Sequence, residues 1–243
     1  MKHLTHLTRL AAVCLFAGVA VAWLPAADDA KAGAGITVDK EKKAVVVDCK
    51  IAPRKIDDPA FKEVYPIEVI ATWPFSKEAG KGGQKAHETV VVFENTVKPS
   101  MIHKALEELG LKAGTPMMGG GAKDVPQGPE VQILLEFTAA DGSTKRMPIE
   151  KALIDPKTKK AMPKLQWRFT GSAMIQPDPN KPDKMYGADQ SGTLISIFPV
   201  TNQTVFQTNL TMAEEKFIKL DTDRELLPKE GTAAKLVIQV PMK

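Results

Sequence analysis

ITVDKEKKAVVVDCKI, at residues 36–51, sets the strand character of this chain. Its apolar residues Val45, Val47 and Cys49 stand at every second position, so they share one face of an extended strand. The charged residues 39–43 are typical of a turn that joins this strand to a shorter one beginning at Ile36. The stretch therefore predicts a β-hairpin with one buried face.

Similar period-two patterns recur along the rest of the chain. Asp141 and Gly142 predict a tight hairpin turn after one of them. In the candidate strand at 164–172, the residues Leu165, Trp167 and Phe169 share one face. The candidate strands are PIEVIAT (66–72), TVVVFE (89–94), VQILLEFT (131–138), KLQWRFTGS (164–172), TLISIF (193–198), TVFQT (204–208), EKFIKL (215–220) and AKLVIQV (234–240).

One segment, PSMIHKALEELG at residues 99–110, has the helical period instead. Pro99 or Ser100 suits its start, and Gly110 suits its end in a left-handed conformation. IEKALI, at 149–154, predicts one or two further helical turns. The buried stripe of the main helix would consist of Ile102, Ala105, Leu106 and Leu109.

These patterns together predict the fold class. Strands and helices do not alternate regularly, which argues against a doubly wound parallel sheet. We expect a strand-rich α+β domain with an antiparallel or mixed sheet, sandwich-like in its packing, and one principal helix at about 99–110.

The first residues are typical of a secretory signal peptide. Lys2 and Arg9 precede an apolar run at 10–24, which is shorter than the roughly 20 residues of a membrane span, and Ala20 and Ala22 offer a cleavage site. We expect a signal peptide over residues 1–27, cleaved near 22–27, then a linker at 28–35 and a single globular domain at 36–243. The protein would be secreted or periplasmic, and would meet a membrane only through an uncleaved signal segment.

Charge and cysteine content narrow the possible functions. Cleavage would leave a net charge of about +2, far from the basic excess that binding to nucleic acid requires. It would also leave one cysteine, Cys49, so no intramolecular disulfide could form, and we interpret Cys49 as a small buried hydrophobe. We expect neither a nucleic-acid partner nor a cofactor.

Two histidines, His87 and His103, lie beyond the signal segment. His87 is followed by Glu88, but neighbours in a strand point to opposite faces, so the two would meet at one site only in a loop. The positive end of the helix disfavours an imidazolium at His103. For each histidine a structural hydrogen bond, a ligand or partner contact, and acid–base or metal chemistry all stay open.

The spacing between the two histidines disfavours a shared metal ion. A strand over residues 89–95 followed by a returning helix would place the rings roughly 15 to 20 Å apart, and zinc needs each nitrogen at about 2 Å. No G-x-S-x-G elbow of a serine hydrolase is present either. We therefore predict no metal site and no catalytic residue.

Five separated segments resemble the YdjY domain family of exported bacterial proteins. The chain departs from the family's usual pattern at Ala86, where an acidic residue commonly precedes the histidine, and at Ala71, near which members often carry a cysteine. The resemblance implies envelope localisation and a domain of unknown function. The segments are KAHET (85–89), HKALEELGLKAGTP (103–116), WRFTGS (167–172), YGADQSGTLISI (186–197) and GTAAKLVI (231–238).

Residues and resemblance lead to one functional hypothesis and one alternative. The hypothesis is a non-catalytic module of the bacterial envelope that binds a small ligand or an envelope protein, with His87, Glu88, His103 and Trp167 as candidate contacts. The alternative is a metal-dependent or acid–base enzyme, or a redox accessory protein, that uses His87 or His103 with nearby carboxylates.

Overall fold

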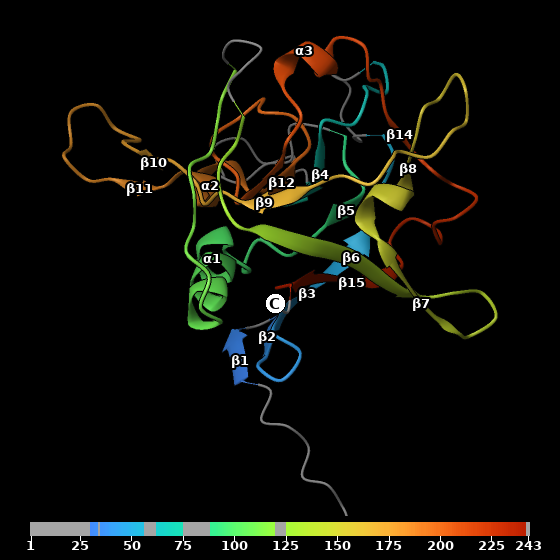
Figure 1. Ribbon diagram of the computed structural model, residues 1–243, viewed down its shortest axis with the longest axis horizontal. Helices are drawn as coiled ribbons and strands as arrows, with labels where there is room; N and C mark the ends of the chain where they lie inside the picture. Colours follow the sequence, from blue (N-terminus) through green and yellow to red (C-terminus); the bar gives the residue numbers. More distant parts are fainter. Residues whose placement is uncertain (1–29, 34, 56–61, 75–87, 120–124, 242–243) are drawn as a thin grey trace, which may run out of the picture.

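The protein is a strand-rich α+β domain (Figure 1). A computed structural model describes residues 30–33, 35–55, 62–74, 88–119 and 125–241. The helices are α1 (Pro99–Glu108), the 3-10 helix η1 (Ile149–Ala152), α2 (Gly187–Ser191) and α3 (Met212–Glu215). The strands are β1 (Ala30–Gly33), β2 (Ile36–Asp39), β3 (Ala44–Ile51), β4 (Val69–Thr72), β5 (Val91–Val92), β6 (Glu130–Thr138), β7 (Thr144–Pro148), β8 (Leu153–Ile154), β9 (Trp167–Phe169), β10 (Met174–Ile175), β11 (Met185–Tyr186), β12 (Thr193–Ser196), β13 (Phe206–Thr208), β14 (Asp221–Thr222) and β15 (Ala233–Gln239).

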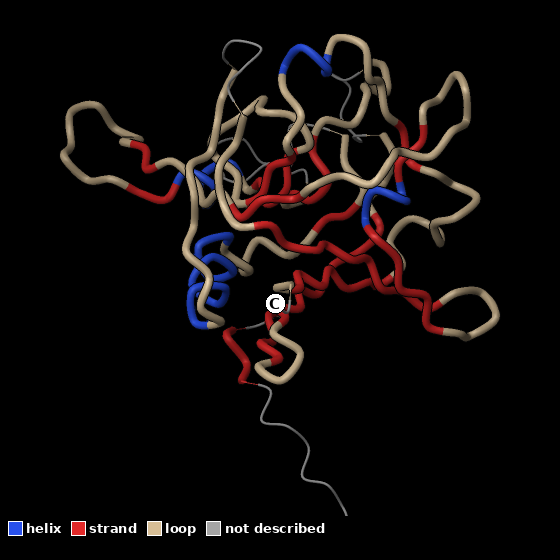
Figure 2. Tube along the Cα trace, viewed as in Figure 1, coloured by secondary structure: helices blue, strands red, loops and turns tan. Residues whose placement is uncertain are grey.

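The main sheet closes into a barrel. Its strand order is β1-β2-β3-β15-β6-β9-β13-β12-β4-β5, and β5 returns to pair with β3. The pairs β12–β13 and β4–β5 are parallel, whereas β15 is antiparallel to both of its neighbours, β3 and β6. The predicted strand-rich α+β class with a mixed sheet is confirmed, and closure replaces the two packed layers of a sandwich. Figure 2 shows most strands of the main sheet at the centre, many of the loops reaching outward, and the β10–β11 hairpin projecting to one side.

Two barrel strands divide one of their edges between two partners. β3 pairs with β2 through Ala44–Val47 and with β5 through Lys50–Ile51. On the edge away from β15, β6 pairs with β9 at Glu130–Val131 and with β7 from Leu134 to Thr138. β7 ends at Pro148, which has no backbone N–H to continue a ladder. Gln132 and Ile133 therefore lie in a gap between β9 and β7.

The alternation in the hairpin at residues 36–51 produces the expected buried face. Val45, Val47 and Cys49 are buried, and they join one apolar core with the aromatic rings of the barrel. Each fully buried ring of this kind contributes about 1.5 to 3 kcal/mol. The enclosed aromatic side chains include Trp73, Trp167, Phe93, Phe169, Phe198 and Phe206.

Helix α1 forms where the sequence predicts it. Ile102, Ala105 and Leu106 of the predicted stripe are buried, whereas Leu109 follows the last helical residue and is only partly buried. Pro99 takes the first helical position, and Gly110 has a φ of 89°. The start is capped from outside the helix, because Asp189 of α2 accepts hydrogen bonds from the Ser100 N–H (2.8 Å) and hydroxyl (2.6 Å). In the described residues, no helix has the length and hydropathy of a membrane span.

Three segments differ from their sequence predictions. EKFIKL is not a strand, because Thr211 and Glu214 form a capping box that starts α3 just before it. Residues 30–33, expected in the linker, form β1 and pair with β2. The strand expected at 89–95 is shortened to β5, although Val90 N–H and Phe93 N–H still bond to the Ile70 and Thr72 carbonyls.

Candidate functional site

Trp167 and Glu150 meet inside the barrel wall beside the gap in the β6 edge. Trp167 opens β9 opposite Val131 of β6, and its side chain is 2% exposed. Glu150 is the second residue of η1, which begins directly after the proline that ends β7, and it is 4% exposed. The Trp167 indole N–H donates a hydrogen bond to Glu150 Oε2 at 3.2 Å.

This hydrogen bond is the single side-chain partner of the Glu150 carboxylate in the described part of the chain. No Lys, Arg or His nitrogen of that part lies within 4.0 Å of it. A buried carboxylate without a cation costs free energy, so such groups are uncommon unless they serve a function. Glu150 is therefore the most informative side chain of the site.

A cavity of about 340 Å³ opens at this place, here called the Trp167 pocket. Glu150 and Trp167 line it together with apolar side chains of β6 and of the segment before β9, including Ile133 and Leu165. Exposed charged residues that also line it are Glu130, Lys151 and Lys164. Its volume falls in the range of roughly 300 to 1,000 Å³ that is typical of small-molecule sites.

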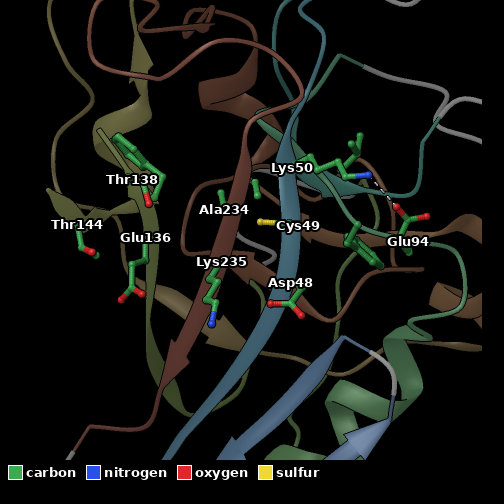
Figure 3. A pocket seen from close by; sticks show the side chains of 13 residues that line it. Asp48, Cys49, Lys50, Glu94, Glu136, Thr138, Thr144, Ala234 and Lys235 are labelled. Atoms are coloured by element: carbon green, nitrogen blue, oxygen red, sulfur yellow. Dashed lines mark hydrogen bonds and ion pairs between the residues drawn. The ribbon is translucent and has the colours of Figure 1, made fainter. Parts of the chain in front are cut away.

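A second hollow lies over β6, β15 and β3, and is here called the β15 groove (Figure 3). Its volume is about 360 Å³. Glu136, Lys235 and Asp48 are neighbours in register across the three strands, and Lys50 pairs with Glu94 at 3.2 Å. Opposite charges therefore already lie beside one another in the groove, unlike the carboxylate of the Trp167 pocket.

Cys49 lines the β15 groove but is only 6% exposed. Burial raises the pKa of the Cys49 thiol to about 12. The thiolate is the reactive form, so its population at pH 8 is very small. The sequence interpretation of Cys49 as a buried hydrophobe is consistent with this position.

We expect Cys49 to resist alkylation in the folded protein. At pH 8, iodoacetamide should modify it at least about 100-fold more slowly in buffer than in urea, because unfolding restores both access and an ordinary thiol pKa. Mass spectrometry of the peptide containing Cys49 measures this rate separately from Cys14. Equal rates in the two conditions would contradict the buried position.

His103 is held in a packing site. Its Nδ1 is hydrogen-bonded to the Tyr186 hydroxyl at 2.7 Å, and its Nε2 lies 3.4 Å from Glu107 Oε1. Its ring meets the ring of Phe169 edge-on, with 5.0 Å between centroids. Burial raises the pKa of Tyr186, so its hydroxyl stays protonated. This arrangement ties α1 to β9 and β11, and it favours the structural interpretation of His103.

Three of the five segments that carry the family resemblance meet around His103. HKALEELGLKAGTP supplies His103, WRFTGS supplies Phe169, and YGADQSGTLISI supplies Tyr186. The Gly114 N–H also donates to the Phe169 carbonyl at 3.1 Å. The contacts of His103 with Phe169 and Tyr186 therefore hold these three segments together, at a place called the His103 junction below.

Glu88 belongs to a buried ionic network centred on Arg54. Arg54 is 5% exposed, and its Nη1 lies 3.4 Å from Glu88 Oε2. Its Nε donates to Asp221, its Nη2 to the Tyr65 carbonyl at 2.9 Å, and its backbone N–H to Glu230 at 2.9 Å. Burial acts to raise the pKa of Asp221, but the hydrogen bond and charge of Arg54 outweigh it, so this pKa lies below its usual value.

The candidate contacts named from the sequence thus have separate surroundings. Glu88 lies with Arg54, His103 with Tyr186, and Trp167 with Glu150. His87 lies outside the described residues, so its distance from His103 stays a prediction. Within the described ranges, no three His, Cys, Asp or Glu residues are grouped so as to hold a metal ion.

Sequence patterns missed Glu150 and Arg54. The sequence pattern places Glu150 only in a short helical segment, and its burial depends on β9, which comes from elsewhere in the chain. Arg54 follows β3 in a stretch without periodicity, where nothing indicates burial.

Comparison with known proteins places this architecture in a family. The sequence model of the YdjY domain matches residues 36–239. The chain belongs to the YdjY domain family. The match runs from the first residue of β2 to the last of β15, so it covers the whole closed barrel and leaves out β1. The YdjY domain is a domain of unknown function, and no curated protein or solved structure matches this chain.

Proposed function

We propose that this YdjY domain is an exported, non-catalytic binding module of the bacterial envelope that takes a small ligand into the Trp167 pocket. The observation that carries the proposal is a partly apolar cavity of about 340 Å³ that is lined by one buried carboxylate, Glu150, which has no cation within 4.0 Å among the described residues. Binding sites combine such apolar walls with a few well-placed polar groups. The proposed export is supported by the residues that resemble a signal peptide.

The surroundings of the pocket favour a small ligand over a protein surface. Protein interfaces are commonly broad, whereas here the buried polar group lies at a local gap between β9 and β7. The His103 junction offers less room for chemistry, because the ring is engaged by Tyr186, Phe169 and Glu107.

The proposal is tested by titrating ¹⁵N-labelled protein with a library of fragment-sized amines, alcohols and carboxylates. The Trp167 indole N–H signal reports on the pocket. The Trp73 indole N–H, which is bonded to the Val97 carbonyl at 3.0 Å, is the internal control. We expect at least one fragment to shift the Trp167 signal saturably while the Trp73 signal stays in place.

Assignment of the two signals comes from Trp167→Phe and Trp73→Phe variants. If no fragment moves the Trp167 signal up to about 10 mM, an affinity that fragment-sized ligands commonly reach, the pocket is not a binding site. Shifts of the Trp73 signal alone would also contradict the proposal.

A further inference from the structure

We infer that the Trp167 pocket selects a small organic cation, a protonated amine or a guanidinium with an apolar body, and that Glu150 pairs with its charge. This inference rests on the proposed function and adds the chemical class of the ligand. It is carried by the partners of the buried carboxylates, the free acceptor positions of Glu150, and the composition of the pocket wall.

Two glutamates are buried in the described part of the chain, and the difference between them is informative. Glu88 is 1% exposed and has the Arg54 guanidinium 3.4 Å away. Glu150 is 4% exposed and has one neutral donor, the Trp167 indole. The fold thus supplies an internal cation to one buried carboxylate and leaves the other for a cation from outside.

The Glu150 carboxylate has room for further donors. An ionised carboxylate can accept about four hydrogen bonds, and the Trp167 N–H fills one position, on Oε2. Ammonium and guanidinium groups bring several N–H donors as well as charge, and such charge-assisted bonds are about twice as strong as neutral ones. Burial strengthens the attraction further, because water screens it less.

The side chains of the pocket wall determine which uncharged body and which further charges a ligand could carry. Ile133, Leu165 and Trp167 give an apolar lining that suits a hydrocarbon or aromatic body. Among the exposed charges that line the pocket, Lys151 and Lys164 outnumber Glu130, so a second positive charge on the outer end of a ligand would be weakly repelled. A monocation is therefore favoured over a polyamine.

Three probes of nearly equal size test the charge requirement: 2-phenylethylammonium, 2-phenylethanol and 3-phenylpropanoate. Their affinities are read from the Trp167 indole signal. We expect the ammonium to bind at least about tenfold more tightly than the alcohol, and the carboxylate to bind most weakly. An alcohol that binds the pocket as tightly as the ammonium would overturn the cation inference and leave the binding proposal standing. Failure of all three probes and of the fragment library would defeat the binding proposal itself.

A matched pair of variants identifies the residue responsible. Glu150→Gln keeps an oxygen acceptor for the Trp167 N–H but removes the charge, and should lower ammonium affinity at least about tenfold without changing alcohol affinity. Glu130→Gln removes the same charge from an exposed position of the same pocket and should change ammonium affinity less than about threefold. An unchanged Trp73 signal and a cooperative melting transition show that each variant is folded. Equal losses in the two variants would overturn the role of Glu150.

Discussion

Replacing Arg54 with methionine should lower the free energy of unfolding by about 3 to 5 kcal/mol. Arg54 is 5% exposed and lies among the buried Glu88, the partly buried Asp221 and the Tyr65 carbonyl, so its loss removes the cation beside Glu88 and the donor of two further hydrogen bonds. Removing one member of a buried ionic group costs far more than removing an exposed pair. Urea denaturation followed by circular dichroism measures the change.

The matched control is Lys50→Met, which removes a cation from the exposed Lys50–Glu94 pair and should cost less than about 1 kcal/mol. Adding Glu88→Gln to Arg54→Met should recover part of the lost stability, because it removes the charge that Arg54 neutralised. If Arg54→Met loses no more than Lys50→Met, the network does not stabilise the fold.

Replacing Gly128 with alanine should cost about 3 to 5 kcal/mol, because backbone strain and a steric clash add together. Gly128 has a φ of +149°, and an added Cβ would lie 2.1 Å from the Phe169 carbonyl oxygen. That carbonyl cannot move freely, since it accepts the Gly114 N–H at 3.1 Å, while the Phe169 N–H donates to the Pro129 carbonyl at 2.9 Å. Thermal and urea unfolding measure the loss.

Gly142→Ala is the control for this substitution. Gly142 also has a positive φ, +80°, but an added Cβ would meet nothing within 4 Å. It should therefore show only the conformational cost of about 1 kcal/mol. Equal losses at Gly128 and Gly142 would mean that the close approach to Phe169 has no energetic weight.

Much of the secondary structure is encoded locally and could be predicted. The hairpin at residues 36–51 and the stripe of α1 follow from periods of two and 3.6 residues, which need no knowledge of the partner. The prediction of a strand at EKFIKL is wrong, because the capping box of Thr211 and Glu214 starts a helix just before this segment and the alternation of EKFIKL is weak. Closure of the barrel could not be predicted, because it depends on pairings such as Lys50 with Val92 that no local pattern specifies.

The candidate site could be predicted only in part, because local patterns contain some of its residues and distant strand pairings bury the others. Trp167 can be named from the sequence, where it lies in the predicted strand at 164–172 and in the WRFTGS segment of the family resemblance. Glu150 could not be named, because its burial arises only when β9 pairs with β6 and brings the indole over η1. The sequence also grouped Glu88 with Trp167, whereas their partners come from different strands and loops.

The position of β15 has a consequence for how the chain reaches its final form. The last strand of the sequence lies between β3 and β6, joined to each by a long antiparallel ladder. Until residues 233–239 are available, the β2–β3 and β6–β7 hairpins have no common neighbour and expose unpaired edges. Closure of the barrel therefore requires residues 233–239 and depends on pairings between residues far apart in sequence, which form slowly and leave the unpaired strand edges exposed to aggregation in the meantime.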